Sequence, residues 1–144
     1  MSYVSNSLLP GERVMHQTHL HKIMFFWPVV LALVGLGMGA LSPPTSGALL
    51  IVSLIYALST YLRYSSSEFA VTDKRVIIKV GLVQRRTLEM LLAKVEAISV
   101  DQGIGGRILG YGSIVVVGTG GTKEAFEKIA DPLEFRRAVQ AATV

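Results

Sequence analysis

Forty consecutive residues without a charged or histidine side chain, Ile23 to Leu62, constrain this chain more than any other feature of its sequence. A soluble fold of 144 residues rarely hides such a run. Charged residues make up only 17% of the chain, below the roughly 25% typical of soluble domains. A turn-forming stretch, LSPPTSG from Leu41 to Gly47, divides the run in two. The pattern predicts two antiparallel transmembrane helices.

The first predicted helix covers residues 23–41, the second covers residues 47–62, and residues 42–46 form the short outer loop between them. Nineteen residues of helix rise roughly 28 Å, close to the thickness of the bilayer core. The second run is slightly short, and it gains length if it begins near Pro44, because proline is tolerated in the first helical turn. A re-entrant or buried soluble hairpin is the alternative. A secretory signal peptide is disfavoured because a second apolar run follows at once.

The charges that flank the two runs predict their orientation. Lys22 precedes the first run and Arg63 follows the second, whereas the loop carries no charge. By the positive-inside rule, both termini face the cytoplasm of a multi-pass cell-membrane protein. Aromatic residues at the same ends of the runs are typical of the membrane interface. They are Phe25, Phe26, Trp27, Tyr61 and Tyr64.

Small residues recur four positions apart within both runs. Gly35 and Gly39 form one such pair, and Ser53 and Ala57 form the other. Pairs of this kind let helix backbones approach closely. They serve either the packing of the hairpin on itself or the packing of one protomer against another.

Residues 65–144 are predicted to form a strand-rich cytoplasmic domain closed by one helix. The helix occupies residues 131–142, with Asp131 and Glu134 in a capping box and Phe135 and Val139 on its apolar face. Residues 1–22 are a cytoplasmic segment that either adds a strand to this domain or lies at the membrane interface. The fold class is therefore an α+β membrane protein. The predicted strands are 68–72, 75–81, 83–90, 94–102, 113–120 and 122–130.

The order of several motifs resembles one known family. These are LLPGERV before the first run, FAVTDKRVIIKVGLVQRRTLEMLLAKVEAISVDQ after the second, then GRILGYGSIVVVGTGG and DPLEFRRAV. Together they resemble bacterial membrane proteins with a pleckstrin-homology-like (PH-like) domain, the bacterial PH domain 2 group. The resemblance implies two transmembrane helices and a split barrel of about seven strands with a C-terminal helix. It also implies homo-oligomers, and it carries no enzymatic activity.

Composition excludes several classes of function. The chain has no cysteine, so disulfides and thiolate metal sites are absent. A net charge of +4 is too small and scattered to indicate a nucleic-acid binder. Ser113 lacks the G-x-S-x-G context of a catalytic serine, and no histidine follows the second apolar run. No catalytic residue, cofactor or metal is predicted.

Two glycine-rich stretches and three histidines have ordinary interpretations. GTGGTKE is a hairpin turn, since it lacks the P-loop spacing. GIGGRILGYG is a sharp corner in which Gly110 and Gly112 adopt positive φ angles. The histidines are placed near lipid headgroups, with metal binding as the alternative. They are His16, His19 and His21.

Five basic residues are the candidate lipid or partner contact: Lys74, Arg75, Lys79, Arg85 and Arg86. Specific recognition of a lipid headgroup, a general attraction to anionic lipids and an ordinary solvated surface remain open alternatives. Neighbouring residues on a strand point to opposite faces, so Arg85 and Arg86 cannot enter one pocket together.

The sequence therefore predicts a non-enzymatic scaffold or adaptor at the cytoplasmic membrane surface. Its expected partners are the lipid bilayer, further copies of the chain in a homo-oligomer, and other membrane proteins. A sensor of anionic lipid headgroups is the alternative function.

Overall fold

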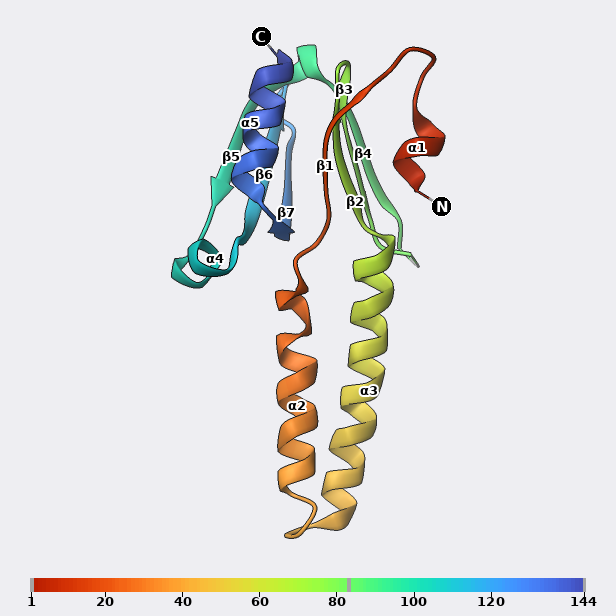
Figure 1. The fold of residues 1–144 in the computed structure, drawn as a ribbon, viewed down its shortest axis with the longest axis vertical. Helices are drawn as coiled ribbons and strands as arrows, with labels where there is room; N and C mark the ends of the chain where they lie inside the picture. Colours follow the sequence, from red (N-terminus) through yellow and green to blue (C-terminus); the bar gives the residue numbers. More distant parts are fainter. Residues whose placement is uncertain (1, 83, 144) are drawn as a thin grey trace.

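The computed structural model describes residues 2–82 and 84–143 and shows a long helical hairpin joined to a domain of two β-sheets (Figure 1). The hairpin consists of a 3-10 turn η1 (Lys22–Phe25), helix α2 (Phe26–Gly37) and helix α3 (Pro43–Ser66). Its closed end lies far from the sheets, and both of its open ends lead directly into the domain.

Both sheets are antiparallel. The first has the order β1-β2-β3-β4 and the second has the order β5-β6-β7. The strands of the first sheet are β1 (Val14–Thr18), β2 (Glu68–Thr72), β3 (Arg75–Val80) and β4 (Arg86–Leu91). Those of the second are β5 (Val95–Asp101), β6 (Tyr111–Gly118) and β7 (Lys123–Ala130). Short elements complete the domain: α1 (Tyr3–Ser7), η2 (Leu92–Lys94), α4 (Ile104–Leu109) and α5 (Pro132–Thr143).

The hairpin is inserted between two neighbouring strands of the first sheet. β1 precedes the hairpin and β2 follows it, and the two pair with Thr18 opposite Phe69. The chain after β1 then crosses to the second sheet, where Leu20 pairs with Ile129 of β7. Of the two predicted roles of the N-terminal segment, the added strand is correct. A domain that begins at residue 65 is wrong, because its first strand lies before the hairpin.

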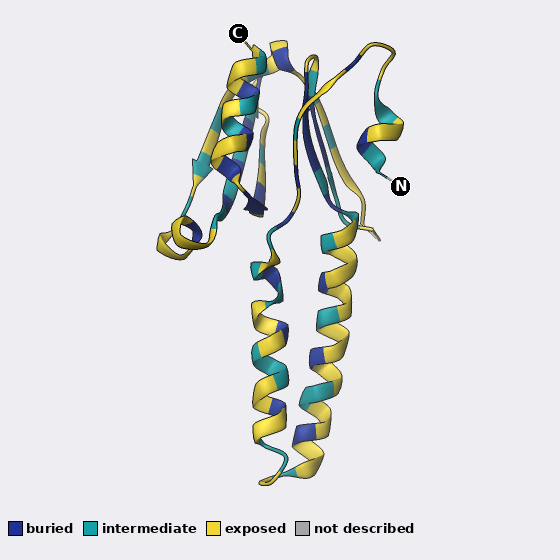
Figure 2. Cartoon of the chain, in the orientation of Figure 1, coloured by how far each residue is buried: buried dark blue, intermediate teal, exposed yellow. Residues whose placement is uncertain are grey.

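One apolar core fills the space between the sheets. Phe69, Val76 and Ile78 from the first sheet meet Ile114 and Ile129 from the second, and all five are fully buried. α5 packs along the opening between the sheets and contributes its apolar face to this core (Figure 2). The predicted face is confirmed, since Phe135 and Val139 are buried and Ala138 and Ala142 are half-buried against the same cluster.

Three local predictions differ from the structure. α3 begins at Pro43, not at Gly47, since both prolines lie in the first helical turn, where a missing N–H costs little. Helix α2 ends at Gly37, so the connection covers residues 38–42 instead of 42–46. The capping box is not formed in the described structure, because Asp131 donates its N–H to Gly110 and Glu134 pairs with Arg137.

The predicted glycine corner contains a short helix, α4. Gly110 ends α4 with φ +82°, as predicted, in the left-handed conformation that glycine favours. Gly112 has no positive φ, contrary to the prediction. It is needed for close packing instead, because a Cβ there would lie 2.6 Å from Cγ of Gln102.

Candidate functional site at the hairpin end of the domain

The five candidate basic residues belong to opposite ends of the first sheet. Lys74 lies in the β2–β3 turn, far from the hairpin, whereas Arg85 lies in the β3–β4 turn beside α3 and Arg86 begins β4 (Figure 1). This separation follows from the antiparallel order, because successive turns alternate between the two ends of a sheet. The five residues therefore do not form one contact surface.

Arg75 is held inside an ion-pair network. Its Nε and Nη2 donate to the two carboxylate oxygens of Glu12 at 3.0 and 3.1 Å, and its Nη1 donates to Glu89 at 2.5 Å. The side chain of Arg75 is 12% exposed, and the side chain of Glu12 is completely buried. Arg75 thus fastens the N-terminal segment to β3 and is not available to a ligand.

The network also fixes the charge of Glu12. Burial alone would raise the pKa of this carboxyl, but hydrogen bonds from Arg75, the Leu9 amide and Thr72 outweigh burial and lower the pKa to about 2. Glu12 therefore stays ionised as a permanent partner of Arg75.

Lys79 is also engaged at the surface. Its Nζ lies 5.3 Å from the centroid of the Tyr3 ring, within the range of a cation–π contact. Tyr3 begins α1, whose first two N–H groups donate to the carboxylate of Glu68 at 3.0 Å each. Lys79 therefore helps to hold α1 over the first sheet.

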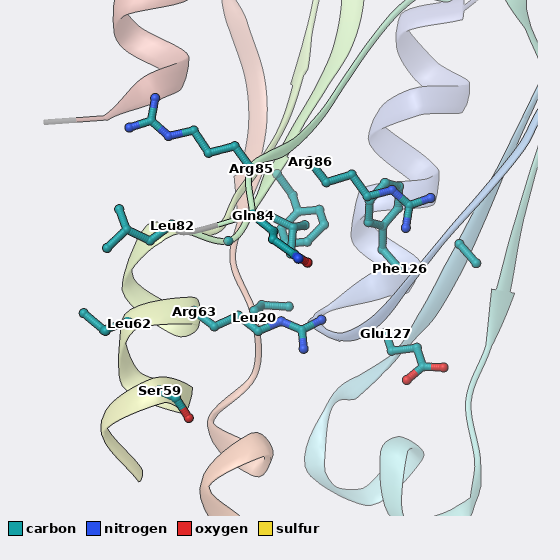
Figure 3. Close-up of a pocket in the computed structure, with 14 residues that line it drawn as sticks. Leu20, Ser59, Leu62, Arg63, Leu82, Gln84, Arg85, Arg86, Phe126 and Glu127 are labelled. Carbon is teal, nitrogen blue, oxygen red and sulfur yellow. The ribbon is translucent and has the colours of Figure 1, made fainter. Parts of the chain in front are cut away.

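Between α3, the β3–β4 turn and β7 lies an open pocket of about 690 Å³. Its apolar floor includes Leu20 and Phe126, and its basic side chains are Arg63, Arg85 and Arg86 (Figure 3). The pocket lies where the hairpin enters the domain.

The two neighbouring arginines behave differently, as the strand alternation predicts. Figure 3 shows their guanidinium groups pointing in opposite directions. Arg86 pairs with Glu124 and lies 5.3 Å from the centroid of Phe126. Arg85 is exposed and points outward from the pocket.

The sequence interpretation missed Arg63 as a member of this site and missed the contacts that attach α3 to it. Ser67 donates to the Arg63 carbonyl at 2.5 Å and accepts from the amide of Gly81 at 3.3 Å. Gly81 has φ +85°, which permits the tight β3–β4 turn. The last turn of α3 and the turn that carries Arg85 are therefore tied together.

The small residues of the hairpin serve its internal packing. A Cβ on Gly35 would lie 3.2 Å from the Leu50 side chain, and the Gly35 carbonyl accepts from Ser46. Ser53 is buried and donates to the Pro28 carbonyl at 2.7 Å. Of the two predicted roles, the structure shows self-packing for Gly35 and Ser53. Gly39 lies beside Ser46, and Ala57 is half-buried.

The three histidines do not converge. His16 lies against Phe135, His19 against Tyr64 and His21 against Tyr111. His21 also accepts the Ile23 amide at 3.0 Å and so caps the first turn of the hairpin. No group of three or more metal-ligating side chains occurs among residues 2–82 and 84–143.

Within the described residues, one helix, α3, is long and apolar enough to cross a membrane by length and composition, whereas the apolar segment Lys22–Gly37 is shorter than this criterion requires. No curated protein and no solved structure matches the chain. Residues 25–143 match the family described as the bacterial PH domain. This match begins after β1, so it leaves out the first strand of the sheet. It covers most of the chain, including all six later strands and α5, and the chain therefore belongs to the bacterial PH domain family.

Proposed function

We propose that the protein is a non-enzymatic PH-like adaptor whose hairpin anchors it in a cell membrane. The observation that carries this proposal is the apolar surface of the hairpin. Large apolar side chains stay exposed along both helices, including Leu36 at 66% and Leu54 at 69% (Figure 2). A contiguous apolar surface of this kind marks contact with lipid or protein.

The hairpin carries apolar side chains on its outer surface and polar side chains between its two helices. Its buried α3 residues are small and polar, namely Ser46, Ser53 and Thr60 at intervals of seven. This arrangement reverses that of a soluble helix, and it is favourable where the solvent is hydrocarbon. η1 and α2 together supply a second apolar helix, 16 residues from Lys22 to Gly37.

The same proposal places both termini in the cytoplasm. Lys22 and Arg63 flank the hairpin at the domain end, and the closed end carries no charge. The positive-inside rule then assigns the domain to the cytoplasmic side.

Two strand edges support an adaptor role for the domain. β4 pairs with β3 and β5 pairs with β6, and in the part of the chain that the structure describes neither has a second neighbouring strand. An open edge is a template for an additional strand from another chain. We infer that β4 and β5 are where a second copy or another membrane protein binds.

Membrane anchoring is tested by extracting the full chain from cells. We expect it to stay in the membrane pellet after alkaline carbonate and to need detergent for solubility. A chain that is monodisperse in plain buffer would contradict the proposal.

The adaptor role is tested by photo-crosslinking in cells. A crosslinker at Ala97 of β5 should give one discrete adduct with a second copy or with another membrane protein. The control position is Glu127 of β7, which lies beside the hairpin-end pocket and away from the β5 edge. Equal, diffuse labelling from both positions would count against the strand-edge interface.

A second candidate function is the recognition of an anionic lipid headgroup at the rim of the hairpin-end pocket. The observation that favours it is the position of Arg63 in the last turn of α3 and of Arg85 in the β3–β4 turn, at the base of the hairpin, where the headgroups are expected (Figure 3). Native mass spectrometry of the full chain with phosphatidylglycerol should show bound lipid that is lost in Arg63→Ala with Arg85→Ala. Lys74→Ala, at the far end of the sheet, is the matched control. Equal retention in both variants would remove this candidate.

A further inference from the structure

Helix α4 carries its apolar side chains outward. Ile104 is 83% exposed, Ile108 is 77% exposed and Leu109 is 52% exposed. Ile104 and Ile108 are four residues apart and share one face of the helix. A short helix on a water-soluble domain normally buries such a face, so these exposures require a different environment.

The opposite face of α4 consists of glycine packed against the second sheet. A Cβ on Gly106 would lie 2.4 Å from the Tyr111 carbonyl oxygen, and one on Gly105 would lie 3.3 Å from the Tyr111 hydroxyl. Only glycine fits this approach at Gly106. α4 therefore cannot rotate to bury its isoleucines without losing the close packing of its glycines against Tyr111 of β6.

α4 lies close to the point where the chain enters the hairpin. The rings of Tyr111, directly after the α4 cap, and His21, directly before η1, are 5.3 Å apart between centroids. Figure 1 shows α4 at the hairpin end of the second sheet. α4 and the start of the hairpin thus lie at the same end of the domain.

We propose that α4 is a second membrane contact, which inserts Ile104, Ile108 and Leu109 into the interfacial layer of the bilayer that holds the hairpin. This inference rests on the proposed membrane anchoring. Lipid is the occupant because the apolar face lies at the same end of the domain as the lipid-facing hairpin. Arg107, exposed in the last turn of α4, is positioned to meet anionic headgroups.

Two contacts fix the domain more firmly than one. The hairpin leads into the first sheet through β1 and β2, whereas α4 belongs to the second sheet between β5 and β6. A bilayer that holds both contacts sets the tilt of the whole domain, and with it the direction that the β4 and β5 edges face.

The absence of cysteine from the chain permits a direct test. Single cysteines replace Ile108 in α4, Ile51 in α3 and Lys74 in the β2–β3 turn, and each carries an environment-sensitive fluorophore. The full chain is placed in nanodiscs that hold one copy each, and quenching by aqueous iodide is measured. We expect iodide to quench the label at Ile108→Cys several-fold more weakly than the label at Lys74→Cys. A quencher attached to lipid near the headgroups should quench the Ile108→Cys label.

The three labels separate the possible failures. If the Ile108→Cys label is quenched as strongly as the Lys74→Cys label while the Ile51→Cys label is protected, the α4 contact is refuted and the anchor stands. If the Ile51→Cys label is also quenched, the anchoring proposal fails as well. Protection at Ile108→Cys only in discs with several copies would show a protein contact and refute the lipid contact.

A substitution provides a second measurement. In Ile108→Cys, the further changes Ile104→Ser and Leu109→Ser should restore iodide quenching several-fold toward the Lys74→Cys level, because the apolar face is removed. Unchanged protection in that variant would refute the insertion.

Discussion

Replacing Glu12 with glutamine tests the buried network that fastens the N-terminal segment to the domain. The carboxylate accepts hydrogen bonds from Arg75, Thr72 and the Leu9 amide while its side chain is fully buried. Its pKa falls from the ordinary 4.5 to about 2. At about 1.4 kcal/mol per pH unit, this difference corresponds to about 3 kcal/mol of folding free energy.

The sign of the pH dependence follows from the direction of that change. A carboxyl whose pKa is lower in the folded state contributes its full stability above pH 4.5. The contribution is lost as pH falls from there toward about 2. Glu12→Gln should therefore destabilise the domain by about 3 kcal/mol at pH 7 and unfold with a weaker dependence on pH below 4.5.

Thermal unfolding of the full chain in a mild nonionic detergent measures this effect. Near-UV circular dichroism at pH 7 and at pH 3 follows the tyrosines of the domain, and the melting temperature at pH 7 should fall by more than about 10 °C. Glu96→Gln is the matched control, because Glu96 is exposed on β5. Equal melting temperatures for Glu12→Gln and the wild type at pH 7 would refute the assignment of the network.

Three further changes probe other parts of the fold. Gly81→Ala should destabilise the domain by at least about 1 kcal/mol in the same assay, since φ is +85° there, while Gly103→Ala, with open space around its Cβ and negative φ, should not. Gly35→Leu should separate the two hairpin helices and lower the melting temperature followed by far-UV circular dichroism, whereas Gly37→Leu meets open space and should leave it unchanged. A chain without residues 2–21 keeps the whole family match but lacks β1, so amide hydrogen exchange in β2 should accelerate to the rate of an open edge; unchanged protection would show that β1 is dispensable.

The sequence predicted those parts of the fold whose signal is local. β-branched runs such as EFAVT and RVIIKV matched β2 and β3 closely, and the apolar face of α5 was read from its helical spacing. β1 remained ambiguous because only Val14 and Met15 are apolar among its five residues. α4 was missed because two adjacent glycines in a six-residue helix read as a corner.

The candidate site was less predictable because its contacts join distant residues. Glu12 and Arg75 are 63 positions apart, and nothing in the local pattern pairs them. Arg63 was considered only as a flanking charge, although the pairing of β2 with β3, with Glu68 opposite Lys79, brings the end of α3 beside the β3–β4 turn. Grouping five basic residues by sequence proximity ignored the alternation of turns between the ends of an antiparallel sheet.

The insertion of the hairpin between β1 and β2 has a consequence for how the chain is made. β1 is synthesised about fifty residues before the strand it pairs with, since Thr18 lies opposite Phe69. During translation it has no neighbour in the first sheet until both hairpin helices have been completed. The β1–β2 ladder can therefore close only after the hairpin is complete. Its closure joins the two open ends of the hairpin within one sheet.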